Sequence, residues 1–118
     1  MNRQEAVTQL AQLCVLTTDK TIGVLLPSFA DVKLFQKELV AKLDGVPDWL
    51  VKRPVQNYSI IKTDNGNQIR FLKSGHETRG MTFNAFYISS RLTEEQRSEY
   101  VFSYLTMPHQ SIITFDDL

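Results

Sequence analysis

An uninterrupted apolar run followed by an amphipathic segment is the feature that most constrains how this chain can fold. The run Thr21–Leu26 is apolar at nearly every position, which is typical of a parallel strand covered on both faces, because a half-exposed strand would alternate. After Pro27, Ser28 is a favourable helix N-cap, and Asp31 places a carboxylate in the first turn. The expected apolar face of this helix consists of Phe29, Val32, Phe35, Leu39, Val40 and Leu43. A strand followed closely by a helix is half of a βαβ unit and predicts an α/β fold.

The segments before and after this strand and helix also have the patterns of regular secondary structure. Residues 4–16 have helical spacing. Their expected buried face consists of Val7, Leu10, Ala11, Cys14 and Val15. The segments 58–63 and 68–72 are β-prone and flank the pair Asn65-Gly66, which predicts a hairpin because both residues tolerate a positive φ.

The C-terminal part is expected to contain a strand at 82–88, a helix from Thr93 and a final strand at 111–115. Thr93 and Gln96 have the spacing of a capping box, and that helix should end before Pro108. The predicted order is therefore α-β-α-hairpin-β-α-β, a small three-layer α/β sheet. A chain of 118 residues has the length of one domain, so residues 1–118 are predicted to form a single domain.

The balance of charges and the small number of cysteines and histidines argue against several classes of protein. The 13 Lys and Arg residues balance 13 Asp and Glu residues, which argues against a protein that coats phosphates generally. The single cysteine, Cys14, excludes an internal disulfide and a cysteine-cluster metal site, and its position predicts an unreactive core thiol. His76 and His109 are far apart, with no second ligand at helical spacing, so no metal site is expected. No cofactor is expected either. No apolar run approaches the roughly 20 residues of a membrane span, so we expect a soluble cytoplasmic protein with no membrane partner.

Three stretches of the chain occur in an order that carries a family resemblance. The first is 19–26 with the helix after it, the second is 60–71 around the hairpin turn, and the third is 78–88, in which Arg79-Gly80 leads into a strand. In this order they resemble the ATPase domain of the large terminase subunits of tailed phages, the motors that pump DNA into procapsids. The resemblance extends from residue 4 to about residue 114 and implies a truncated P-loop (RecA-like) ATPase core.

The chain departs from that family at the groups that perform the chemistry. No G-x-x-x-x-G-K-[ST] sequence is present to cradle phosphates. Where the resemblance implies the Walker B acids, the chain has Ser89-Ser90, and a hydroxyl carries no charge to hold Mg²⁺. The resemblance therefore implies a degenerate ATPase fold that is not an enzyme and has no catalytic residue. The strand ahead of the phosphate loop is also missing, so we expect an open sheet edge, covered either by a reordered sheet or by pairing of two copies.

A few residues are candidates for contacts with a partner or a nucleic acid. They are Lys62, Arg70, Lys73, Arg79 and Trp49. The first three make the hairpin locally basic, although a solvated hairpin face also requires alternate polar side chains. Arg79 is either a retained contact or a solvated residue, and Trp49 is either an exposed anchor or a side chain folded over the preceding helix. Asp116-Asp117 follow a strand end, where α/β proteins place ligands, but a solvated tail is the favoured interpretation.

The three stretches occur in the order of the terminase family, but the phosphate loop and the Walker B acids are missing. This combination indicates a protein that recognises a partner rather than one that catalyses a reaction. The expected function is that of a non-catalytic phage or prophage protein that binds a protein partner in the host cytoplasm, namely the packaging motor, the portal or a host factor. Self-association through the open sheet edge is a further expected contact. One alternative is a nucleic-acid-binding module that uses the 58–73 hairpin. Another is a nucleotide-binding protein that completes its site with a loop of a partner chain.

Overall fold

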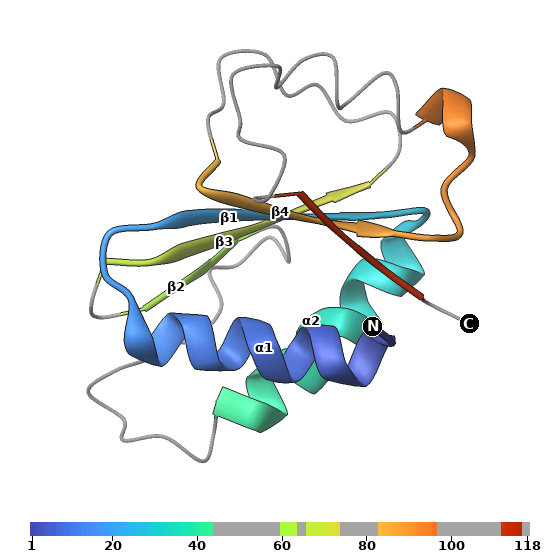
Figure 1. The fold of residues 1–118 in the computed structure, drawn as a ribbon. Coiled ribbons are helices and arrows are strands. Elements are labelled where there is room, and N and C mark those ends of the chain that lie inside the picture. Colours follow the sequence, from blue (N-terminus) through green and yellow to red (C-terminus); the bar gives the residue numbers. More distant parts are fainter. Residues whose placement is uncertain (44–59, 64–65, 74–82, 97–111, 117–118) are drawn as a thin grey trace.

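A computed structural model describes residues 1–43, 60–63, 66–73, 83–96 and 112–116. They form a five-stranded sheet with two helices on one of its faces (Figure 1). The elements are α1 (Arg3–Leu16), β1 (Thr21–Leu26), α2 (Phe29–Leu43), β2 (Ile60–Lys62), β3 (Gln68–Lys73), β4 (Ala85–Ser89) and β5 (Ile112–Phe115). The predicted order of these elements is confirmed.

The apolar strand β1 lies at the centre of the sheet. The strand order is β2-β3-β1-β4-β5. β1 pairs in parallel with β3 and with β4, β4 pairs in parallel with β5, and β2 pairs with β3 in the antiparallel direction. Every residue from Ile22 to Leu26 is buried, as expected for a strand that has a neighbour on each side. The sheet is therefore a mixed α/β sheet, and its edges are β2 and β5.

The main core lies between the sheet and the two helices, which cover the same face (Figure 1). Phe35 of α2 is fully buried there. Its ring centroid lies 6.1 Å from that of Phe71 on β3 and 5.6 Å from that of Phe115 on β5. The Tyr87 hydroxyl of β4 donates a hydrogen bond to Oε1 of Gln9 in α1 at 2.5 Å. Aromatic packing and this bond together fix both helices to the sheet.

The opposite face of the sheet carries a second apolar cluster. Its buried members are Leu25, Leu72, Phe83, Phe86, Ile88 and Leu92. Leu92 belongs to the segment that follows β4, and this segment continues into the predicted capping box. The Gln96 amide donates to the Thr93 hydroxyl at 3.1 Å, and the Thr93 amide donates to Oε1 of Gln96 at 2.9 Å. The capping box is confirmed, whereas the rest of the predicted helix, and with it the second helical layer, falls outside the described residues.

Several sequence predictions of burial and strand limits were wrong. Val15 is 39% exposed, because the buried face of α1 ends with Cys14 and the next residue points about 100° around the helix. Phe29 is 48% exposed, because it is the first residue of α2 and lies under the Lys33 ammonium, 5.2 Å from its ring centroid, rather than under the sheet. β4 begins at Ala85 rather than at residue 82.

The hairpin is confirmed, and a buried asparagine fastens it to α1. Gly66 has a φ of 91°, as the predicted turn requires. Asn67 is fully buried, and its Nδ2 donates to the carbonyl oxygens of Cys14 at 3.0 Å and Thr17 at 2.7 Å. Its Oδ1 accepts a bond from the Lys20 amide at 3.0 Å. This side chain joins the end of α1, the entry to β1 and the hairpin, and no sequence pattern had singled it out.

Candidate functional site

The candidate site lies at the carboxyl ends of β1 and β4. In α/β proteins, ligands most often bind at the corresponding position of the sheet. These strands are adjacent and parallel. The chain leaves β1 toward α2 on one face and leaves β4 toward residues 90–96 on the other face (Figure 1). Neighbouring strands whose connections diverge in this way define a topological switch point, and α/β proteins place ligands in the crevice outside it.

Asp31 and Arg91 face each other across this switch point. Asp31 lies in the first turn of α2, and Arg91 follows β4 by two residues. An Nη2–Oδ1 ion pair joins them, with 18% of the Asp31 side chain and 38% of the Arg91 side chain exposed. The Ser28 hydroxyl donates to Oδ2 of Asp31 at 2.5 Å and accepts the Asp31 amide at 3.3 Å. Ser28, the predicted N-cap of α2, therefore also forms a hydrogen bond with the carboxylate of the ion pair.

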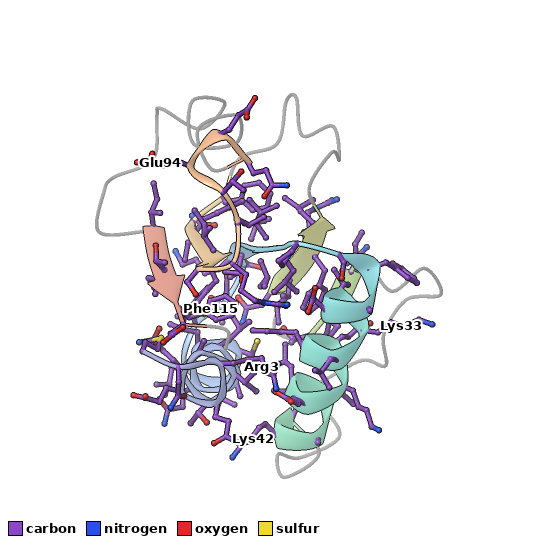
Figure 2. The ribbon with its side chains drawn as sticks, turned by 90° about the vertical axis from the view of Figure 1, so that its right-hand side faces the viewer. Arg3, Lys33, Lys42, Glu94 and Phe115 are labelled. Carbon is purple, nitrogen blue, oxygen red and sulfur yellow. The ribbon has the colours of Figure 1, made fainter. Side chains whose placement is uncertain are left out.

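The surroundings of Asp31 favour its charged form. Burial raises the pKa of this carboxyl, but the hydrogen bonds from Ser28 and Arg91 and the charges of Arg91 and Arg3 outweigh burial, so its pKa lies below the ordinary value. Arg3 also pairs with Glu38 of α2, with 3.2 Å between Nη2 and Oε1. Figure 2 shows Arg3 between the two helices and Lys33 on the outer side of α2. Asp31 is thus held as an anion by groups of its own chain.

Ser89 and Ser90 stand at the carboxyl end of β4, next to this ion pair. Ser89 is fully buried, and its hydroxyl accepts the Arg91 amide at 3.2 Å. The Ser90 hydroxyl donates to Oδ1 of Asp116 at 3.3 Å, and the Ser90 amide donates to the Phe115 carbonyl at 2.9 Å. Each of these serine hydroxyls therefore has a hydrogen-bond partner within the chain.

The N-terminus of α1 lies beside the same end of the sheet. The Asp116 amide donates to the Met1 carbonyl at 2.7 Å, and Asn2 forms an isolated parallel bridge with Asp116. Asn2 is the N-cap of α1, with its Oδ1 accepting the Glu5 amide at 2.8 Å, while Glu5 accepts the Asn2 amide at 3.3 Å. A carboxylate, Glu5, therefore already stands at the positive end of this helix.

These groups define what the site can do chemically. It offers a guanidinium, several hydroxyls and the carboxylates of Asp31 and Asp116, each with a partner within the chain. Among the described residues there is no group of three side chains of the types that hold a metal ion. Such an arrangement can form hydrogen bonds and single ion pairs with a bound molecule.

The hairpin brings together two of the predicted basic contacts. Ile61 and Ile69 are paired across β2 and β3 and point into the core under the helices. Because side chains alternate along a strand, Lys62 and Arg70 point to the opposite face of the sheet. Lys62 is exposed and Arg70 is half-buried. Lys73 is the last residue of β3.

The other residues that the sequence singled out add little to the description of the site. Trp49, Arg79 and Asp117 lie outside the described residues. Cys14 is buried on α1 as predicted, and burial raises the pKa of its thiol to about 12. A groove of about 960 Å³ lies between α1 and α2, on their side of the molecule, and is lined mainly by polar side chains.

The ion pair and the capping box of α1 were not predicted from the sequence. Ser28 and Asp31 had been identified only as a helix start, and Arg91 carries no local signal because its partner lies 60 residues away. The spacing of Asn2 and Glu5 is that of a capping box, and this signal was available in the sequence. The ion pair, in contrast, required the knowledge that β1 and β4 are neighbours.

No protein-family model matches the chain, and no curated protein sequence matches it. The described part of the chain contains no helix with the length and apolar character needed to cross a bilayer.

Proposed function

We propose that this chain is a non-catalytic phage or prophage protein, related in architecture to a terminase ATPase domain, that acts by binding a protein partner. The partner would be the packaging motor, the portal or a host factor. The observation that carries the proposal is the pair Ser89-Ser90 at the carboxyl end of β4, beside β1 and β5. The resemblance implies carboxylates at this position, and hydroxyls there supply no negative charge for a magnesium complex.

The N-terminus of α1 supports the same proposal. A P-loop joins a strand to a helix, and the first amides of that helix bind phosphate. Here α1 begins directly after the bridge between Asn2 and Asp116, and its first turn is closed by the Asn2–Glu5 capping box. The carboxylate of Glu5 would repel a phosphate at this place. A scaffold that keeps the strand arrangement without the phosphate and magnesium ligands is suited to recognition.

Affinity capture tests this proposal. The tagged chain is incubated with lysate from its host during phage growth, crosslinked and analysed by mass spectrometry, with the tag alone as the control. We expect crosslinks between this chain and one partner, and that partner, once purified, should bind the chain in a separate titration. Absence of any specific partner, or a partner that fails to bind when purified, would contradict the proposal.

A second function is favoured by the hairpin. Lys62 and Arg70 lie on the face of the sheet opposite α1 and α2, and cations on one exposed face can contact phosphates. In this case DNA retention should fall steeply with added salt because phosphate contacts release counterions. The variant Lys62→Gln/Arg70→Gln should then lose that retention, while Lys33→Gln/Lys37→Gln on α2 should keep it.

A further inference from the structure

We draw no further inference here: the strongest candidate, the groove of about 960 Å³ between α1 and α2, is lined by amide, carboxylate and ammonium side chains together, and nothing in the structure shows what covers it.

Discussion

Arg91, two residues beyond β4, forms an ion pair with Asp31 in the first turn of α2. The pair spans the switch point between β1 and β4, where an α/β sheet usually exposes a ligand crevice. Because Ser28 also donates to Asp31, the β1–α2 turn and the end of β4 are held together by contacts within the chain. This region of the fold is thus stabilised by an ion pair and a hydrogen bond within the chain.

Replacing Asp31 tests the contribution of this ion pair. Asp31→Asn should lower the free energy of unfolding by about 1 kcal/mol at pH 7, since it removes a partly exposed charge pair and weakens a helix cap. The folded-state pKa of Asp31 lies below its ordinary value of 3.8, so the stabilisation is present above that value and is lost as the pH falls through the folded-state pKa. Urea unfolding at several pH values should therefore show the two proteins converging in acid. A difference that stays constant into acid would contradict the role assigned to the carboxylate.

Removing the buried Asn67 side chain should be among the most damaging single changes at a polar residue. Asn67→Ala leaves the carbonyls of Cys14 and Thr17 and the Lys20 amide without this partner. We expect a loss of about 2–4 kcal/mol in urea unfolding. Asn84→Ala is the matched control, because Asn84 is exposed and accepts one bond, from the Thr21 amide at 2.9 Å; it should lose only about 1 kcal/mol. Equal losses would show that burial of Asn67 has no special importance.

Gly23 is required because the Phe86 ring occupies the space of its missing side chain. A Cβ at this position would lie 2.5 Å from Cδ2 of Phe86. Gly23→Ala should therefore destabilise the chain by about 1–3 kcal/mol through overpacking. Phe86→Leu makes room, so the double variant should be more stable than the sum of the two single effects predicts, by about 1 kcal/mol. Additive effects in a denaturant double-mutant cycle would argue against this contact.

Cys14 and Tyr87 should make the fold sensitive to alkali. Burial raises the pKa of Cys14 from 9.0 to about 12, and burial, followed by the neighbouring Cys14, raises that of Tyr87 from 10.0 to about 12. A raised folded-state pKa means that the unfolded chain releases its proton first, so stability is lost as the pH rises from 9 toward 12. Cys14→Ala should show a shallower loss over this range in urea unfolding. A thiol reagent should label Cys14 of the native parent only slowly until the chain unfolds. Rapid labelling of the native chain at pH 8, about one unit below the pKa of a free thiol, would contradict the burial of Cys14.

Local patterns predicted most of the elements of the fold. The run Thr21–Leu26 indicated a doubly covered strand, and the Ser28 cap and the Thr93–Gln96 capping box were correctly placed. These features depend on residues within a few positions of one another, so the sequence displays them directly. The exposure of Val15 and Phe29 was not predicted, because periodicity identifies the face of a helix but not where the helix extends past its sheet.

The contacts of the candidate site depend on sheet order and could not be predicted in the same way. Arg91 meets Asp31 only because β1 and β4 are neighbours, and Asn67 reaches Cys14 only because β3 lies on the other side of β1. The position of Ser89-Ser90 at a strand end was expected, whereas the hydrogen bond from Ser90 to Asp116 was not, since it requires β5 beside β4. Contacts between distant segments therefore became visible only with the structure.

The central claim is our proposal that this chain has an ATPase-like scaffold without the groups that bind and hydrolyse a nucleotide. Isothermal titration of the purified chain with ATP, in the presence and absence of Mg²⁺, combined with a phosphate-release assay on the same sample, tests it most directly. The claim predicts no saturable heat and no phosphate release above the buffer blank. Saturable Mg²⁺-dependent binding, or phosphate release that grows in proportion to the concentration of the chain, would contradict it.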